Sequence, residues 1–158
     1  MSFSVSERIY TKNMKITIIN GPNLNLLGLR EPAIYGLDTY LELVKKIEDY
    51  CQSLGIKVKI MQTNHEGTII DMLQNCYGEC DGIILNPGGY THTSIAIGDT
   101  LAAIQIPTAE VHISDVDSRE DFRKISFIRP HCEITISGHG TDGYIEAIKY
   151  FYDKFNKG

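Results

Sequence analysis

Lys15-Ile-Thr-Ile-Ile-Asn20 is a short apolar run that leads directly into the loop Asn20-Gly-Pro-Asn-Leu-Asn-Leu-Leu-Gly-Leu-Arg-Glu-Pro-Ala-Ile-Tyr-Gly36. The run is typical of a buried parallel strand. The loop holds glycines, prolines and asparagines that shape the backbone, with one arginine and one tyrosine that can do chemistry. A loop of this length in a compact domain is usually functional or disordered. Ligands of an open α/β sheet bind beyond the carboxyl ends of its strands, so this loop is the first candidate for a binding site.

Strand and helix patterns alternate five times along the chain. Short runs rich in Val, Ile and Leu predict strands at Lys15–Asn20, Ile56–Met61, Asp81–Asn86, Thr108–Ile113 and Cys132–Ser137. A capping box, Thr39-Tyr-Leu-Glu42, predicts the start of the first helix, and Gly55 predicts its end. Further helices are expected at about 66–76, 93–104 and 142–155, with a short one opening at Ser118-Arg-Glu-Asp121. Five strand–helix units without a linker predict one doubly wound α/β domain.

The composition is that of one soluble domain. Of 158 residues, 42% are hydrophobic and 22% are charged, and the formal net charge is −5, which argues against nucleic acid as a partner. No apolar run approaches the ~20 residues that span a bilayer, so no membrane association is expected. Residues 1–13 are polar and lack the core of a signal peptide, so we expect an N-terminal extension there and a single catalytic domain over 14–158. The four cysteines form no CxxC pair, which favours reduced thiols and a cytoplasmic protein.

Polar and glycine-rich segments follow each of the five expected strands. Because the strands of a parallel sheet end at one rim, these segments are expected to meet there. Four of the five histidines fall in them. The segments are Asn20–Gly36, Gln62–Gly67, Asn86–His92, His112–Asp115 and Ser137–Gly140. Loops are polar in any protein, so each segment alone could be structural; their convergence favours a site.

Several standard sites are excluded by their missing motifs. The first loop has no GxxxxGK[ST] and no Ser/Thr-rich phosphate cradle, the first strand lacks the paired acids of a receiver domain, and no GxSxG elbow is present. Gly138-His-Gly-Thr-Asp-Gly143 matches GxGxxG, but no second βαβ half follows it, so tight turning and close packing explain its glycines better. Four rim histidines could bind zinc, and Cys76 and Cys80 are four residues apart, but no HxH, HExxH or CxxC spacing supports a metal site.

Acid–base chemistry on a small polar molecule remains. Tyr35 is the candidate base and His112 the candidate acid. A tyrosine with the ordinary pKa of ~10 is rarely ionised at neutral pH, a handicap of roughly 4 kcal/mol, which the nearby Arg30 would reduce by favouring the phenolate. Glu110 lies two residues before His112 on a strand, so both point to the same side and Glu110 could orient the imidazole. Each residue also has a structural interpretation, as a ring closing the core, a solvated charge or a satisfied histidine.

The expected helix at 93–104 is apolar nearly all round, with Asp99 in its middle. Such a helix is expected to be buried on more than one face, and a buried carboxylate needs a partner. A subunit interface would meet both requirements.

Five ordered motifs make the chain resemble the type II 3-dehydroquinate dehydratases (type II dehydroquinases). They are Asn20-Gly-Pro-Asn-Leu-Asn, Gly28-Leu-Arg-Glu-Pro-Ala-Ile-Tyr-Gly36, Gln62-Thr-Asn-His-Glu-Gly67, Leu85-Asn-Pro-Gly-Gly-Tyr-Thr-His-Thr-Ser94 and Glu110-Val-His-Ile-Ser114. The resemblance runs from about Met14 to Phe155. It implies a flavodoxin-like fold, which is a doubly wound five-stranded parallel sheet in three αβα layers. It also implies a dodecamer, built as a tetramer of trimers.

The implied reaction is anti elimination of water from 3-dehydroquinate through an enolate, giving 3-dehydroshikimate without a cofactor or a metal. By the same resemblance, Tyr35 removes the C2 proton, Arg30 lowers the pKa of Tyr35, and His112, oriented by Glu110, protonates the leaving C1 hydroxyl. Asn23 helps to hold a water against the enolate oxygen. The implied substrate contacts are Asn86, His92, Ile113, Ser114 and Arg123, with Asp99 reaching the neighbouring subunit's site.

The chain departs from the family pattern at three positions, which concern the interface and the rim. Gly98 stands where Arg is common, and Asp115 and Asp117 stand where Asn and His are common. Two other functions stay open at this point. One is a binding module that kept the fold and lost activity; the other is a metal-dependent hydrolase that uses the rim histidines.

Overall fold

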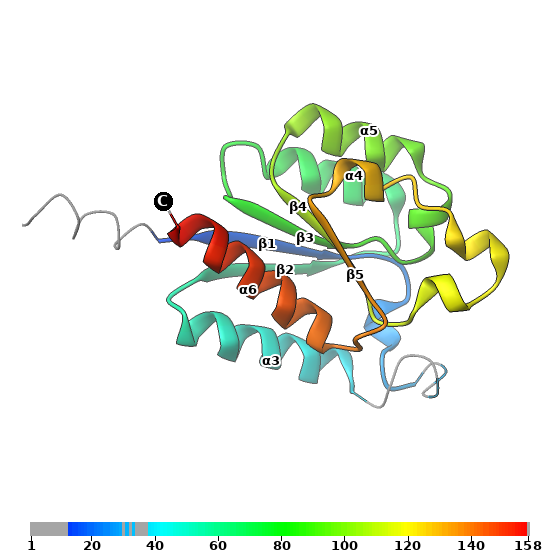
Figure 1. Ribbon diagram of the computed structural model, residues 1–158, viewed down its shortest axis with the longest axis horizontal. Coiled ribbons are helices and arrows are strands. Elements are labelled where there is room, and N and C mark those ends of the chain that lie inside the picture. The colour runs from blue at the N-terminus through cyan, green and yellow to red at the C-terminus, as the bar shows by residue number, and fades with distance from the viewer. Residues whose placement is uncertain (1–12, 30, 32, 34–37, 158) are drawn as a thin grey trace, which may run out of the picture.

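The computed structural model describes residues 13–29, 31, 33 and 38–157. The chain forms one five-stranded sheet with helices on both faces (Figure 1). The strands are β1 (Lys15–Asn20), β2 (Lys57–Gln62), β3 (Gly82–Asn86), β4 (Thr108–His112) and β5 (Ile134–Ser137). The longer helices are α3 (Tyr40–Ser53), α4 (Glu66–Asn75), α5 (Ile95–Ile104) and α6 (Asp142–Asn156). Five 3₁₀ turns lie between them: η1 (Leu24–Leu26), η2 (Gly88–His92), η3 (Val116–Ser118), η4 (Asp121–Lys124) and η5 (Arg129–His131).

The sheet has the strand order β2-β1-β3-β4-β5, and every neighbouring pair is parallel. This is the flavodoxin-like order: β2 is added on one side of β1, and β3, β4 and β5 are added on the other side, so the strand order reverses between β1 and β3. Helices α3 and α6 cover one face and α4 and α5 the other (Figure 1). β3 is buried along its whole length because both faces of this central strand are covered. The prediction of a doubly wound five-stranded parallel sheet in three layers is therefore confirmed.

Two hydrophobic clusters fill the two sides of the sheet. One joins inward residues of α3 and α6, such as Leu43 and Phe151, to β1. The other joins α4 and α5, through Leu73 and Leu101, to β3. Among the described residues, no helix is both long and apolar enough to cross a bilayer.

The predicted elements agree with the observed ones except at their ends and at one helix. The capping box of α3 is present, because Thr39 Oγ1 accepts the Glu42 N–H at 3.2 Å and the Glu42 carboxylate accepts the Thr39 N–H at 2.8 Å. The helix expected from Ser118 is wrong, since only the 3₁₀ turns η3 and η4 form there. The Ser118 hydroxyl donates to the carbonyl of Asp115 at 2.9 Å and does not cap a helix.

Helix α5 is buried on one face in the single chain, and the expected cover of its other face by a second subunit stays a prediction. Its inward face comprises Ile97, Gly98, Thr100, Leu101 and Ile104. Its other face is exposed and comprises Ile95, Ala96, Asp99, Ala102 and Ala103. Asp99 is therefore a surface carboxylate in the single chain, where a neighbouring subunit could supply its partner.

All four cysteines are free thiols. Cys51 and Cys76 are buried, and Cys80 and Cys132 are partly buried. Helix α4 ends at Asn75, so Cys76 and Cys80 lie beyond its last residue.

Candidate active site

A cavity of about 410 Å³ opens at the carboxyl ends of β1, β3 and β4. This is the position at which open α/β sheets bind ligands. Seven of the eleven predicted site residues line the cavity: Asn23, Asn86, His92, His112, Ile113, Ser114 and Arg123. Glu110 lies directly behind His112 and is fully buried. The convergence that the sequence predicted for these eight side chains is thus present in the structure.

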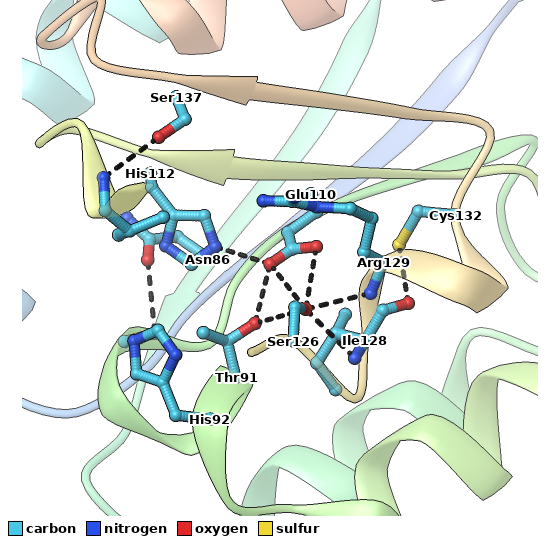
Figure 2. Close-up of polar contacts among 12 residues, drawn as sticks. Asn86, Thr91, His92, Glu110, His112, Ser126, Ile128, Arg129, Cys132 and Ser137 are labelled. Carbon is cyan, nitrogen blue, oxygen red and sulfur yellow. Dashed lines mark hydrogen bonds and ion pairs between the residues drawn. The ribbon is translucent and has the colours of Figure 1, made fainter. Parts of the chain in front are cut away.

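The buried pair Glu110 and His112 lies at the end of β4. Residues two apart on a strand face the same side, and here His112 Nε2 lies 2.5 Å from Glu110 Oε2 (Figure 2). Glu110 also accepts hydrogen bonds from the hydroxyls of Thr91 and Ser126. Burial alone would raise the pKa of Glu110. The hydrogen bonds from His112, Thr91 and Ser126, with the charge of His112, outweigh burial and hold the pKa below its ordinary value.

His92 lies across the cavity on η2. Its Nδ1 is 2.7 Å from the carbonyl oxygen of Ile125 (Figure 2). A carbonyl only accepts, so Nδ1 carries the hydrogen, and Nε2 is left as the ring nitrogen that a ligand can contact. Burial lowers the pKa of His92 below its ordinary value, and the charges of His112 and Arg123 act in the same direction. His92 is therefore suited to be a neutral hydrogen-bonding group.

Asn86 is fixed in a buried network between the two faces of the sheet. Its Nδ2 donates to the Tyr144 hydroxyl at 2.8 Å, and that hydroxyl donates to Asn20 Oδ1 at 2.7 Å. Asn86 Oδ1 accepts the Gly88 N–H at 3.1 Å and so shapes the turn into η2. The amide is thereby oriented before any ligand arrives.

The first loop is docked onto the loop after β3 through a close backbone contact. The Gly21 N–H donates to the Asn86 carbonyl at 2.7 Å, and a Cβ at position 21 would lie 2.6 Å from the Pro87 oxygen. Only glycine permits this approach. Asn23 follows in the left-handed region, with φ 69°, and its N–H donates to Asn64 Oδ1 at 3.0 Å. The segment Gln62–Gly67 thus supports the first loop at the cavity rim.

Two arginines border the cavity from the segment after β4. The sequence predicted Arg123, whose Nε donates to Glu120 at 2.8 Å. It did not single out Arg119, whose guanidinium lies 3.5 Å from the Ser114 hydroxyl. The sequence does contain a signal for Arg119, because it is a second arginine four residues before Arg123. Together the two arginines make this side of the cavity positive, which suits a carboxylate.

The other three predicted site residues are Arg30, Tyr35 and Asp99. Arg30 and Tyr35 lie outside the described residues, so their expected positions at the site stay predictions. Asp99 is on the exposed face of α5, away from the residues that line the cavity. Within the described ranges, no three His, Cys, Asp or Glu side chains gather closely enough to hold a metal ion.

Comparisons with known proteins give a consistent result. The model of the family described as dehydroquinase class II matches residues 14–152. A protein named 3-dehydroquinate dehydratase from Fusobacterium nucleatum subsp. nucleatum is 50% identical over 147 residues, which covers 91% of this chain and 100% of that protein. A Fusarium vanettenii protein named catabolic 3-dehydroquinase 1 is 49% identical over 135 residues, covering 85% of this chain and 94% of that protein.

Solved structures agree. The crystal structure of the type II dehydroquinase from Butyrivibrio crossotus is 52% identical in sequence and superposes with a TM-score of 0.86, over 91% of this chain and 98% of that one. With a family match over most of its length and a relative matched from end to end, the chain belongs to the dehydroquinase class II family.

Proposed function

We propose that this protein is a type II 3-dehydroquinate dehydratase, a lyase that eliminates water from 3-dehydroquinate to give 3-dehydroshikimate. The observation that carries the proposal is the buried Glu110–His112 pair at a cavity whose rim holds two arginines. An acid backed by a charged partner, facing a site that suits a carboxylate, is what dehydration of a hydroxylated acid requires. The reaction belongs to the shikimate pathway, and quinate breakdown uses the same step.

His112 is the acid in this mechanism. Because the ionised Glu110 only accepts, His112 Nε2 carries a hydrogen and Nδ1 is left as the nitrogen that exchanges a proton with the substrate. When Nδ1 is protonated, the imidazolium is stabilised by the Glu110 charge beside it. It then gives the Nδ1 proton to the C1 hydroxyl as the C–O bond breaks.

Tyr35 is the base, and Arg30 is its activator. The Tyr35 phenolate removes the proton from C2, which forms an enolate and no covalent intermediate. The guanidinium of Arg30 favours the phenolate and offsets part of the roughly 4 kcal/mol that ionising a tyrosine costs at neutral pH. Asn23, at the cavity rim, helps to hold a water that donates to the enolate oxygen.

The remaining contacts position the substrate. Arg123 binds the substrate carboxylate, and Ile113 and Ser114, which also line the cavity, contact the substrate beside it. Asn86 and His92 bind hydroxyl groups from the opposite side, and their own hydrogen bonds already orient them. No cofactor and no metal takes part in this mechanism, and the partner is the small-molecule substrate alone.

The protein also assembles with itself, as a tetramer of trimers, and acts in the cytoplasm. The exposed face of α5 supports assembly, because it is apolar apart from Asp99, and Ile95 is 59% exposed. In the trimer Asp99 reaches the neighbour's site. Four free thiols support a reducing compartment.

One assay tests the activity. Purified protein is mixed with 3-dehydroquinate, and the absorbance of the conjugated enone product is followed with and without a chelator. We expect turnover that the chelator does not change. Turnover abolished by the chelator would support a metal-dependent reaction, and no turnover would support a binding module.

A further inference from the structure

We propose that Thr91 and Ser126 are positioning residues of the acid. Their hydroxyls hold Glu110 as an ionised acceptor and so fix the tautomer of His112. The proposal rests on the proposed function, in which His112 is the proton donor. Neither residue is needed to bind substrate, since neither lines the cavity.

The hydrogen bonds of Ser126 leave its hydroxyl hydrogen for the Glu110 side. Its oxygen accepts the N–H groups of Ile128 at 3.1 Å and of Arg129 at 3.0 Å (Figure 2). A hydroxyl has two lone pairs and one hydrogen, so both lone pairs are used. Ser126 Oγ lies 3.2 and 3.1 Å from the two Glu110 carboxylate oxygens, to which its hydrogen can be donated.

Thr91 is constrained in turn by Ser126. The two hydroxyl oxygens are 3.0 Å apart, but Ser126 has no lone pair left to accept from Thr91. Thr91 therefore donates to Glu110 Oε2, at 2.6 Å. The Thr91 side chain is almost fully buried, so water does not replace this bond if the hydroxyl is removed.

These donors make a neutral Glu110 unfavourable. Oε2 is within hydrogen-bond distance of Thr91 and His112, and Ser126 is within reach of both oxygens. Hydrogen bonds donated to a carboxylate stabilise its charged form over the neutral acid. An ionised Glu110 forces the hydrogen of His112 onto Nε2. The geometry thus links two hydroxyls outside the cavity to the nitrogen that faces the substrate.

Among the described residues, the other ionisable groups near the pair are Cys132, His92, Arg123 and Arg129. Burial, with the Glu110 charge, raises the pKa of Cys132 to about 12, so this thiol stays neutral. Burial lowers the pKa of His92 below its ordinary value, so this ring loses its charge at a lower pH than an exposed histidine. Arg123 on η4 and Arg129 on η5 keep their charges throughout. Only the network around Glu110 is changed in a Thr91 variant, so the difference in the acid limb between that variant and the wild type reports the Glu110–His112 pair.

The same contacts fasten the segment that carries Arg123. The Phe127 N–H donates to the Thr91 carbonyl at 2.9 Å, and His92 Nδ1 donates to Ile125 at 2.7 Å. Ser126 lies between Ile125 and Phe127 in the sequence, and its hydroxyl donates to Glu110. A purely structural role for Thr91 and Ser126 is thus possible, and the test must separate it from control of the acid.

The separating variant is Thr91→Val, which keeps the shape of the side chain and the backbone bond to Phe127. Thr108→Val is the matched control, because Thr108 is a buried threonine on the same strand as Glu110, and its hydroxyl donates to the Ile106 carbonyl at 2.9 Å. We expect Thr91→Val to lower kcat about tenfold with KM little changed. Thr91→Ser restores the hydroxyl and is expected to restore the rate, and Thr108→Val is expected to keep it.

The direction in which the acid limb of the pH profile moves distinguishes control of the acid from a purely structural role. The Glu110 pKa is depressed by its donors, so losing one raises it, and the carboxylate is protonated at a higher pH than in the wild type. The acid limb of kcat should move up by about one pH unit in Thr91→Val, and the same direction is expected for Ser126→Ala. Thermal unfolding of each variant measures the structural effect separately.

A measurement without substrate keeps this test apart from the proposed function. The ¹⁵N shifts of the His112 ring should give hydrogen on Nε2 in the wild type, and a mixture of tautomers in Thr91→Val. If the wild type did not turn over 3-dehydroquinate, the proposed function would fail while these shifts still tested the hydroxyl network. Thr91→Val with an unchanged acid limb and unchanged ring shifts, or Thr91→Ser that stays as slow as valine, would overturn the inference.

Discussion

Gly98 makes a closer contact than any side chain would allow, and Gly98→Ala is expected to destabilise the protein. A Cβ at this position would lie 2.6 Å from the Phe127 carbonyl oxygen and 3.1 Å from the His131 ring. The oxygen belongs to a backbone held by the Phe127 N–H bond to Thr91, so it cannot simply move away. Overpacking of this kind costs about 1–3 kcal/mol.

Helix propensity acts in the opposite direction. Alanine is better than glycine inside a helix by about 1 kcal/mol, so propensity alone would make Gly98→Ala stabilising. We expect the steric clash to outweigh helix propensity because the clashing atom belongs to the backbone. The free energy of unfolding should then fall by roughly 1–2 kcal/mol. For a chain of this size that is a fall in Tm of about 2–8 °C.

Gly67→Ala is the control for propensity. Gly67 is also helical, in the first turn of α4, but nothing lies within 4 Å of a Cβ added there. We expect the Tm of Gly67→Ala to equal that of the wild type or to be slightly higher. Both variants are measured by calorimetry at equal protein concentration. If Gly98→Ala were as stable as Gly67→Ala, the close approach of α5 to Phe127 would not exist in solution.

Four further outcomes are expected from the proposed mechanism. Tyr35→Phe should lower kcat by at least ~10²–10⁴-fold with KM little changed, and near-normal turnover would remove Tyr35 from the role of base. Arg30→Ala should lower kcat more than it weakens binding, whereas Arg123→Ala should mainly raise KM; steady-state kinetics showing the reverse would exchange the two assignments. A chain that starts at Met14 should keep its rate and its size in light scattering, because residues 1–13 show no apolar periodicity; a loss of either would give that segment a role in assembly. Asp99→Ala should lower the rate and loosen the trimer together, and a wild-type chain that is active as a monomer would contradict a shared site.

The sheet was predictable from the sequence because parallel strands covered on both faces appear as short apolar runs. β1 has the bounds that the sequence predicted, and the other strands begin or end within one or two residues of the predicted ones. The gathering of the polar segments at one rim of the sheet was also predictable, since the carboxyl ends of parallel strands lie at the same edge. Asn86, His92 and His112 line one cavity although 26 residues of sequence separate the first from the last.

Contacts made by common residue types were not predictable. Thr91 lies within one of the five motifs but was not singled out, and Ser126 lies in none of them. Their bonds to Glu110 arise only when η2 and the turn before η5 pack against β4. The pattern from Ser118 failed for a related reason, because its hydroxyl had a nearer partner in the carbonyl of Asp115. The outer face of α5 illustrates a different limit. An apolar stripe in the sequence shows that a face needs cover, but it does not tell which chain supplies it.

The buried charge of Glu110 connects the stability of the fold to its chemistry. A carboxylate without partners in the interior would cost several kcal/mol, and Glu110 has no contact with solvent. Its donors come from three separate segments: His112 on β4 itself, Thr91 on η2 and Ser126 before η5. The charge is tolerated only after all three have docked, so the acid forms together with the fold. Substitutions at these donors should therefore be tested for both stability and rate. A measurement of only one of the two would miss part of what the residue does.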